Sequence, residues 1–585
     1  MTLIHNGAKT TCSGVPGTPL LSLLQSADAA AVHAPCGGKQ HCGKCKIKIL
    51  SGICSEPSAR ELTFLSPEEA AAGIRLACFA YAKSDVSIET VTAQAQILGA
   101  NGSAGGHLSP IAIRRAAQLP PPSLTDQRDD FTRLKDALGM PTTTISPLQL
   151  AKLPGVLRSS GFAVTVTSAG NCIIDVAAGI SATPFCGLAV DIGTTTVVMS
   201  LVDLQSGAVF DAESGLNRQA AYGGDVISRI QNATENENGG EALRKAIVDQ
   251  LNSLASALCA RNKLNTTDIP AIALVGNTVM THLLLGLPTA EIAKAPFVPV
   301  CNDTLVLPAA ALGLQLHPEA IALVAGGVSA YVGGDITAGV LSSGLMEDDA
   351  LALFIDIGTN GEIALGNRNA LVSCSTAAGP AFEGGHIRCG TGGVAGAINS
   401  VRLDGGKPVY TTIGGAPAIG ICGSGVLDAA AALLDAGIID ETGCLETDDE
   451  IDGVSVFRIT DKIYFTAKDA REIQLAKAAV RAGIDTLLDA LGAEENDVQK
   501  VYLAGGFGNY MDKKSAVRIG LIPECLLERI IPLGNAAGSG AIRLLLDDGA
   551  QAALATLRGK MTYLELSSNA FFQDAYIEQM MFPEV

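Results

Sequence analysis

The sequence is poor in basic residues and has no long uninterrupted apolar run. Its 585 residues include 40 Lys and Arg against 59 Asp and Glu, which gives a formal net charge of −19. Nucleic-acid binding requires basic surface that displaces counterions, so this balance argues against DNA or RNA as a partner. A membrane-spanning helix needs about 18 consecutive apolar residues, and no such run occurs. The N-terminus also lacks the charged and apolar regions of a secretory signal.

Histidine is scarce as well, and the seven histidines show no metal-ligand spacing. Of the 15 cysteines, four lie near the N-terminus and the other eleven are scattered singly, as expected of thiols in a reducing cytoplasm. Glycine, by contrast, is abundant, with 65 residues in a chain that is 48% hydrophobic. This composition predicts an α/β protein with many tight turns, and the length predicts several domains.

The four N-terminal cysteines form the strongest metal-binding pattern in the chain. Cys36, Cys42 and Cys45 follow the spacing C-x5-C-x2-C, and 32 residues separate Cys45 from Cys78. A 2Fe–2S cluster requires four thiolates, and glycines between the ligands let the backbone approach its sulfurs. A zinc site and thiols without a metal are the alternatives, although zinc sites usually repeat a short C-x-x-C knuckle. The pattern favours an electron-carrying 2Fe–2S cluster, with Cys54 as a thiol outside it.

Composition divides the chain into four parts. Short alternating strands around the cysteines indicate a 2Fe–2S domain over residues 1–93. Gly-rich and then Pro-rich segments indicate a linker over residues 94–125. Two alternating segments flank a turn at residues 168–171 and predict a hairpin within a small α/β middle domain, residues 126–186. The remaining part, residues 187–585, is the largest.

The largest part contains two related halves. A buried apolar strand ends in Asp-Ile-Gly-Thr at residues 191–194 and again at residues 356–359, and each time a second strand follows. Each half also has a later strand-to-helix turn with glycine, near residues 276–278 and 505–508. Glycine beside hydroxyl groups lets backbone N–H groups approach phosphate oxygens, and a carboxylate at a strand end can hold hydrated Mg²⁺. The repetition predicts a duplication in which two hairpins clamp a polyphosphate across a cleft.

The candidate site residues follow from these motifs. We expect Asp191 and Asp356 to organise Mg²⁺ and the attacking water, and Glu383 either to act with them or to cap a backbone turn. The phosphate-binding candidates are Gly193, Thr194, Thr195, Thr196, Gly358, Thr359 and Asn360. A further glycine turn contributes Gly423 and Ser424, and the adenosine is expected to be bordered by Gly505, Gly506 and Phe507.

Three further charged residues allow either a functional or a purely structural interpretation. Asp225 and Asp335 each follow Gly-Gly, and each can either surround magnesium or cap the helix that begins there. Lys477 lies on a helix predicted to start at Thr466. It can approach nucleotide or, as we expect, lie on a solvated face.

These motifs resemble those of a known family. The two hairpins and the adenosine turn are similar to the actin, hexokinase and heat-shock-chaperone superfamily of ATPases. Residues 222–229, 275–280 and 377–384 resemble phrases in the ATPase domain of the reductive activators of corrinoid-dependent methyltransferases. The cysteine segment and the linker are arranged as in that family, so the resemblance covers nearly the whole chain. The first cysteine gap is five residues instead of the four of plant-type ferredoxins, which looks like the adrenodoxin-like variant.

The resemblance implies a multidomain α/β fold with a β-grasp-like 2Fe–2S ferredoxin domain, a linker, a small middle domain and a two-lobed, duplicated ribonuclease-H-like ATPase domain. It implies ATP-dependent transfer of one electron from the cluster to Co(II) of a corrinoid protein, which regenerates Co(I). The implied cofactors are the 2Fe–2S cluster, ATP and Mg²⁺. The implied partners are the corrinoid protein and an upstream low-potential electron donor, with no nucleic acid and no membrane, and a homodimer is one option for the assembly.

Two alternatives stay open at this point. The ATPase part is also compatible with a small-molecule kinase that carries a redox-sensing ferredoxin domain, which would phosphorylate an acceptor. It is equally compatible with a redox-sensing regulator that binds nucleotide and does not hydrolyse it.

Overall fold

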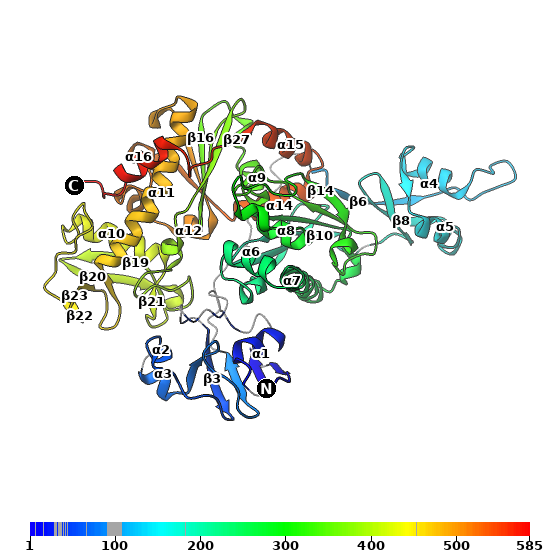
Figure 1. Ribbon diagram of the computed structural model, residues 1–585. Coiled ribbons are helices and arrows are strands. Elements are labelled where there is room, and N and C mark those ends of the chain that lie inside the picture. The colour runs from blue at the N-terminus through cyan, green and yellow to red at the C-terminus, as the bar shows by residue number, and fades with distance from the viewer. Residues whose placement is uncertain are drawn as a thin grey trace.

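The computed structural model divides into a small N-terminal domain, a small middle domain and a large part built on two six-stranded sheets (Figure 1). The residues that it describes are 1–5, 8–15, 17–27, 32, 38, 40, 43, 45–65, 67–90, 108–181, 183–451 and 453–584. Within these residues, every helix is too short or too polar to cross a bilayer.

The N-terminal domain is a five-stranded sheet packed on one helix. The strand order is β2-β1-β5-β3-β4, and β1 and β5 run parallel while the other neighbours are antiparallel. The elements are β1 (Thr2–His5), β2 (Ala8–Thr11), α1 (Leu20–Ala27), β3 (Lys46–Ser51), β4 (Ile74–Leu76) and β5 (Ser87–Thr90). Leucines of α1 pack with Leu3, Ile47 and Ile88 of the sheet in one buried core. This arrangement confirms the predicted ferredoxin domain.

The middle domain contains the predicted hairpin, formed by β8 (Ala163–Ala169) and β9 (Cys172–Ala178). Its sheet also includes β7 (Thr144–Ile145) and β6 (Ala112–Gln118), and β6 pairs with β8 along its whole length. Strand β6 thus lies within residues 94–125, which the sequence predicts as a linker. Ala112 is buried and the Pro-rich run starts only at Pro120, so the strand fits between the two turn-rich segments.

The two halves of the large part have matching sheets, which confirms the predicted duplication. The first sheet has the order β12-β11-β10-β13-β15-β14 and the second has β26-β25-β16-β17-β18-β27. Both contain three antiparallel strands (β12-β11-β10 and β18-β17-β16) next to two parallel ones (β13-β15 and β25-β26). The sixth strands differ, because β14 adds to the parallel end of the first sheet and β27 to the antiparallel end of the second. The first-half strands are β10 (Cys186–Ile192), β11 (Thr196–Asp203), β12 (Val209–Leu216), β13 (Ala271–Gly276), β14 (Leu305–Pro308) and β15 (Ile321–Val324). The second-half strands are β16 (Ala352–Ile357), β17 (Gly361–Gly366), β18 (Leu371–Thr376), β25 (Lys500–Ala504), β26 (Ile530–Gly534) and β27 (Met561–Tyr563).

Two helices join the halves through small residues. Helix α9 (Gly334–Ser343) packs against α14 (Ala536–Leu546) in the core shared by both sheets. A Cβ placed on Gly540 of α14 would lie 2.2 Å from the backbone oxygen of Ala338, so the two backbones touch at this point. This close packing also fixes the positions of the two helix N-termini relative to each other.

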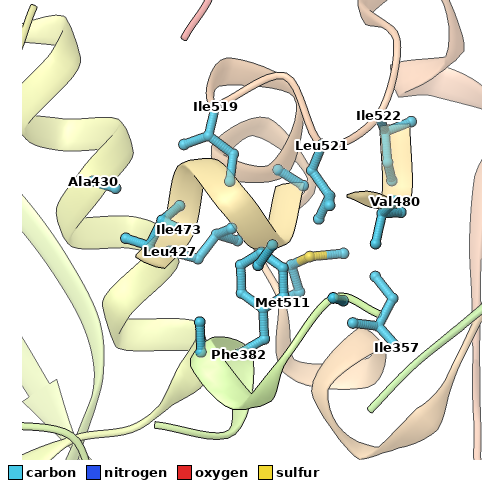
Figure 2. Packing of buried hydrophobic residues seen from close by; sticks show 14 of the residues in the cluster. Ile357, Phe382, Leu427, Ala430, Ile473, Val480, Met511, Ile519, Leu521 and Ile522 are labelled. Carbon is cyan, nitrogen blue, oxygen red and sulfur yellow. The ribbon is translucent and has the colours of Figure 1, made fainter. Parts of the chain in front are cut away.

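The largest core lies in the second half, around α11 (Ala467–Leu491). Figure 2 shows Ile473 of α11 beside Leu427 of α10 (Gly423–Asp435) and Val480 of α11 beside Ile522. Phe382, which lies in a short turn after β18, belongs to the same core. The helices α12 (Gly505–Tyr510) and α13 (Lys513–Arg518) border the same core. The turn beside the glycine-rich motifs is thus packed against α10 and α11.

Lys477 on α11 is buried, with 1% of its surface exposed, so the expected solvated face is wrong. The C-terminal segment covers this side of α11: Nζ donates a hydrogen bond to the carbonyl oxygen of Met581 and lies 5.8 Å from the ring centre of Phe582. Burial lowers the pKa of Lys477 to about 8, since desolvation disfavours the charged form. Through these contacts Lys477 holds the C-terminal segment against α11.

Candidate functional site

Two of the four predicted cluster ligands lie side by side in the N-terminal domain. Cys45 precedes β3 and Cys78 follows the neighbouring β4, and the backbone N–H of Ala77 donates to the carbonyl oxygen of Cys45 at 2.8 Å. Both cysteines are buried, and their sulfurs are 3.3 Å apart. The side chain of Gln40 donates to the carbonyl oxygen of Cys78 at 2.9 Å.

This pair fits two ligands of a single 2Fe–2S cluster, which draws its thiolates together from separate elements. Cys36 and Cys42 lie outside the described residues. Cys54 pairs with Ala82 beyond the far end of β3, so the strand separates it from Cys45.

In the large part, carboxylates from both halves lie close enough to affect one another's pKa, and the region that they border is called the cleft below. Asp191 and Asp356 are the last residues but one of β10 and β16, and Asp335 lies in the first turn of α9. Desolvation first, and then the charge of Asp335, raise the pKa of Asp191 to about 7. The pKa of Asp356 is also raised to about 7, by desolvation first and then by the charges of Asp335 and Asp191. Desolvation raises the pKa of Asp335 to about 6.

A fourth carboxylate, Glu362, belongs to the second half alone. It is the register partner of Asp356 in the antiparallel pairing of β16 and β17, so both side chains lie on the same face. Its pKa lies well above the ordinary value because of desolvation and the charges of Asp335 and Asp356. In the first half, the register partner of Asp191 is Val198. The two hairpins therefore differ in charge although they match in fold.

The spacing of these carboxylates limits the kind of metal site that they can form. Asp191, Asp335 and Asp356 are half-buried, and the protein packed around them desolvates their carboxyl groups. Within the described ranges, no three acidic, His or Cys side chains gather closely enough to enclose one metal ion. This spacing fits Mg²⁺, which usually keeps several waters and takes one or two carboxylates plus substrate phosphates.

Three polar side chains hold the first hairpin in place through hydrogen bonds to Gly193 and Thr194. Arg229 on α6 (Val226–Glu235) donates to the carbonyl oxygens of Thr194 at 2.6 Å and Gly223 at 2.9 Å. Asn217 donates to the carbonyl oxygen of Gly193 at 2.8 Å. The side chain of Asn277, which caps α8 (Thr278–Leu285), donates to the hydroxyl oxygen of Thr194 at 3.0 Å. Thr194 is thereby fixed to α6 through Arg229 and to the later glycine turn of its half through Asn277.

The other first-half candidates lie at the hairpin tip and around it. Thr195 is exposed, its carbonyl oxygen accepts from the backbone N–H of Asn217 at 2.8 Å, and Thr196 begins β11. Asp225 caps α6, where its side chain accepts from the backbone N–H of Ser228 at 2.8 Å. Of the two Asp residues that follow Gly-Gly, Asp225 is thus a helix cap, whereas Asp335 faces the other cleft carboxylates.

The second hairpin is held by Glu383. The Thr359 hydroxyl donates to Glu383 Oε2 at 2.9 Å, and the backbone N–H of Gly358 donates to the carbonyl oxygen of Asn360 at 2.9 Å. Glu383 has an exposed surface, yet the surrounding protein desolvates its carboxylate and raises its pKa. It is therefore a carboxylate at the mouth of the cleft, in contact with the phosphate-binding candidate Thr359.

The glycine turns of the second half meet around two stacked rings. Phe507 stacks on Phe382, with ring centres 4.9 Å apart and planes inclined by 14°. A Cβ on Gly423 would lie 1.8 Å from the carbonyl oxygen of Phe382 and 3.0 Å from Phe507 Cδ2, so only glycine fits there. Gly506 is exposed and a Cβ there would meet no protein atom within 4 Å. The Ser424 hydroxyl donates to the carbonyl oxygen of Asn399 at 2.8 Å, which turns its proton toward the protein.

Three residues of the cleft are not among those predicted from the sequence. Glu362 lies in a predicted strand, and its register opposite Asp356 is readable from the short turn between them. Asn535 caps α14 and its side chain forms a hydrogen bond with Asp191, which lowers the pKa of that carboxyl against the larger effect of burial. Asn217 supports the first hairpin from the end of β12. For Asn535 and Asn217 no local signal exists, because their partners are distant in sequence.

Family models match the chain along most of its length. Residues 3–83 match the 2Fe-2S iron-sulfur cluster binding domain, and residues 103–182 match the RACo linker region. Residues 186–348 match the RACo middle region, and residues 350–585 match the C-terminal domain of RACo, the ASKHA domain.

Individual proteins are similar to the chain over most of its length. The corrinoid activation enzyme RamQ of Eubacterium limosum is 36% identical over 439 residues, which cover 71% of this chain and 74% of that protein. The Co(II) methylated amine-specific corrinoid protein reductase of Methanosarcina barkeri is 25% identical over 429 residues, which cover 68% and 77%. A solved structure, a reductive activator for corrinoid, iron-sulfur protein, is 35% identical with a TM-score of 0.77 and covers 100% of this chain and 98% of its own.

Proposed function

The chain belongs to the RACo family of reductive activators of corrinoid proteins, and we propose that it performs ATP-dependent reductive activation of such a protein. In this activity it passes one electron to Co(II) and so regenerates Co(I). The observation that carries the proposal is the combination on one chain of the paired sulfurs of Cys45 and Cys78 with a cleft where Asp191 and Asp356 from the two halves meet.

The N-terminal domain is proposed to hold the redox centre. A 2Fe–2S cluster supplies one-electron chemistry when bound. Cys45 and Cys78 would hold it together with Cys36 and Cys42. Burial of Cys45 and Cys78 keeps water from their sulfurs, and Gln40 fixes the backbone of Cys78.

The two hairpins are proposed to bind the phosphates of ATP. Arg229 and Asn217 engage the carbonyl oxygens of Thr194 and Gly193, which leaves the N–H groups of the first hairpin to face phosphate. On the opposite side, Thr359 and Asn360 line the second hairpin, with Gly358 at its turn. The N-termini of α9 and α14 lie at the same cleft, and helix N-termini favour negative charge. Gly505, Gly506 and Phe507 are proposed to border the adenosine.

The carboxylates are proposed to organise hydrolysis. Mg²⁺, when bound, neutralises phosphate charge and holds water. Asp191 and Asp356 would hold it through its waters, with Asp335 and Glu362 nearby. Glu383, hydrogen-bonded to Thr359, would orient the attacking water. Mutual repulsion contributes to the raised pKa values of Asp191 and Asp356, and a divalent cation removes that repulsion.

ATP is needed if the electron transfer is unfavourable by itself. Plant-type clusters have potentials near about −400 mV, and every 59 mV uphill lowers the equilibrium constant of a one-electron step about tenfold. Nucleotide can drive such a step when its binding or hydrolysis changes the favoured conformation. A cleft whose walls come from two separate sheets supplies an element that closes on nucleotide.

The proposed partners follow from the relatives' names and from electron balance. The relatives are named for acting on corrinoid proteins, which supports a corrinoid protein as the partner of this chain. An upstream low-potential donor must refill the cluster, since each turnover removes one electron. The singly scattered cysteines support a reducing cytoplasm as the location.

The decisive experiment measures Co(I) yield from a Co(II) corrinoid protein, by anaerobic visible spectroscopy at fixed reductant potential. With MgATP we expect a much higher yield than without it. Asp356→Ala should not respond to MgATP. The control Asp404→Ala, which removes an exposed carboxylate from the hairpin of β19 (Ala397–Asp404) and β20 (Lys407–Thr412), should respond as the wild type does. Equal yields with and without MgATP would overturn the proposal.

Phosphate analysis in the same mixtures separates the alternatives. Reductive activation releases phosphate to water, and binding of the corrinoid protein should raise the rate. A kinase would transfer phosphate to an acceptor, and a regulator would release none with any partner.

A further inference from the structure

A second pocket lies at the far end of the two helices that leave the nucleotide cleft. Its volume is about 290 Å³, and it is formed between the end of α9, the turn between β17 and β18, α14 and α15 (Ala550–Lys560). Ligand pockets are typically about 300 Å³ or larger, so this one suits a small molecule. None of the residues that line it belongs to the candidate nucleotide site.

The chemistry of the pocket is an apolar floor with a basic rim. Its floor includes Leu341, Met346 and Leu557, and its rim includes Arg368, Arg543 and Lys560. Arg543 pairs with Glu347 and Arg368 pairs with Asp349 at 2.9 Å, so the rim carries one more cation than acids. Three cations around one pocket are notable in a chain with a net charge of −19. Such a lining complements a molecule with an apolar body and an anionic group.

The basic side chains are held in place by the protein itself. Arg543 donates to the carbonyl oxygen of Leu341 at 2.7 Å and to Glu347 Oε1 at 2.8 Å. Lys560 donates to the carbonyl oxygen of Arg368 at 2.7 Å, and Arg368 donates to the carbonyl oxygen of Glu347 at 2.6 Å. A guanidinium has five N–H donors and an ammonium three, so these contacts leave donors for an anion. Side chains already ordered by the protein lose less entropy on binding.

The pocket also joins the two halves of the large part. Helix α15 is fixed to the first half by Arg558, which donates to the carbonyl oxygen of Gly327 at 2.8 Å and to Asp303 Oδ1 at 2.9 Å. Arg368, across the pocket, belongs to the second half. Lys560 directly precedes β27 of the second half, so the first half reaches the pocket through Leu341 of α9. A ligand that touches both Leu341 and Arg368 therefore responds to the relative placement of the halves.

The same helices connect this pocket with the cleft. Asp335 lies in the first turn of α9, and Leu341 lies near its other end; Asn535 caps α14, and Arg543 lies in its last turn. A helix of 10 residues is about 15 Å long, so α9 spans the distance in one rigid element. Close packing of α9 on α14 leaves little room for independent movement.

We propose that this pocket binds a small organic anion with an apolar body, and that its occupancy and nucleotide binding in the cleft influence each other. Binding of the anion does not depend on the proposed nucleotide function, whereas its coupling to nucleotide does. An anion that favours one placement of the halves must change the affinity for nucleotide. By linkage, nucleotide must change the affinity for the anion by the same factor.

The binding test uses anilinonaphthalene sulfonate, an aromatic body with one sulfonate, on the full-length chain. Since the chain has no tryptophan, Asn369→Trp places a single tryptophan at the rim of the pocket. We expect saturable quenching of its emission by the bound dye. A single tryptophan at the remote position Tyr410 on β20 should be quenched far less. Equal quenching at the two positions would place the dye elsewhere and overturn the site.

The charge test replaces Arg368 and Lys560 together by glutamine. Dye affinity should fall about tenfold or more, equivalent to at least about 1.4 kcal/mol. The matched control replaces Arg261 and Lys245, an exposed arginine and lysine on α7 (Gly239–Arg261) that each pair with acidic residues, and should leave affinity unchanged. Unchanged affinity in the Arg368 and Lys560 variant would overturn the site.

The coupling test repeats the dye titration of Asn369→Trp with saturating MgATP. We expect dye affinity to shift at least about threefold, and the shift to vanish in the Asp356→Ala background. Dye binding without any shift would overturn the coupling and support the pocket alone. Failure of the proposed nucleotide function would abolish the shift and leave dye binding intact, so the two failures are distinguishable.

Discussion

Gly505 stands directly against the carboxylate of Asp356. A Cβ added to Gly505 would lie 2.6 Å from Asp356 Oδ1 and 3.0 Å from the carbonyl oxygen of Ile357, and its φ of +86° is strained for any other residue. The turn that starts α12 and the strand that carries the carboxylate therefore leave no room for a side chain. The cleft carboxylate and the glycine-rich turn are one packed unit.

Gly505→Ala should consequently lower both stability and ATP hydrolysis. The left-handed backbone costs about 1–2 kcal/mol for a residue with a Cβ, and the overlap with Asp356 adds to it by displacing the carboxylate. Thermal melting and phosphate release measure the two effects. The matched control is Gly492→Ala, which has φ of +63° but open space around its Cβ. It should lose stability only, and equal loss of hydrolysis in both variants would contradict the close contact as the cause.

The pH dependence of stability should reflect the cleft carboxylates. The pKa values of Asp191 and Asp356 are raised to about 7 in the folded chain, above the ordinary value of 3.8, so the folded state binds more protons between about pH 4 and 7. Without nucleotide or Mg²⁺, the melting temperature of the large part should therefore fall as pH rises through this window. Asp356→Asn should flatten the slope and raise the melting temperature at pH 8. A slope unchanged by Asp356→Asn would be evidence against the shift.

The same titration should govern metal binding. Mg²⁺ binds the ionised carboxylates, so affinity for MgATP should rise as pH passes through about 7. Calorimetric titration at several pH values measures this dependence, together with the protons released on binding.

The cluster ligands can be tested by metal content. Anaerobically purified chain should contain about two iron and two sulfide per chain. Cys45→Ala and Cys78→Ala should each lose the cluster, because their adjacent sulfurs occupy neighbouring ligand positions. Cys54→Ala, beyond the far end of β3, is the control and should keep it. Stoichiometric zinc without sulfide would end the electron-transfer proposal.

Arg229→Lys should weaken nucleotide binding although it keeps the charge. A lysine ammonium places all its donors on one nitrogen and cannot occupy both positions from which Nε and Nη2 of the guanidinium reach Gly223 and Thr194, so the first hairpin loses support. We expect affinity for MgATP to fall about tenfold, or ~1.4 kcal/mol. Arg261→Lys at an exposed position on α7 is the matched control. If both variants bind nucleotide equally, Arg229 serves stability alone.

Motifs contained within short stretches of the chain are predictable from the amino-acid sequence by itself. The repeated Asp-Ile-Gly-Thr and the strand that follows it appear as β10–β11 and β16–β17, because a buried apolar strand and a tight turn are encoded locally. The 2Fe–2S domain is predictable for the same reason, since its signal is a cysteine spacing. The duplicated fold follows from the likeness of the two halves.

Tertiary structure decided which side chains meet. Asp335, Asn535 and Glu362 join the cleft carboxylates only because α9, α14 and β17 converge there from separate parts of the chain. Lys477 has the sequence context of a surface residue, but the C-terminal segment more than 100 positions later buries it. Likewise β6, within turn-rich sequence, becomes a strand by pairing with β8. Local sequence encodes backbone preference, whereas burial and pairing depend on distant partners that only the folded chain brings into contact.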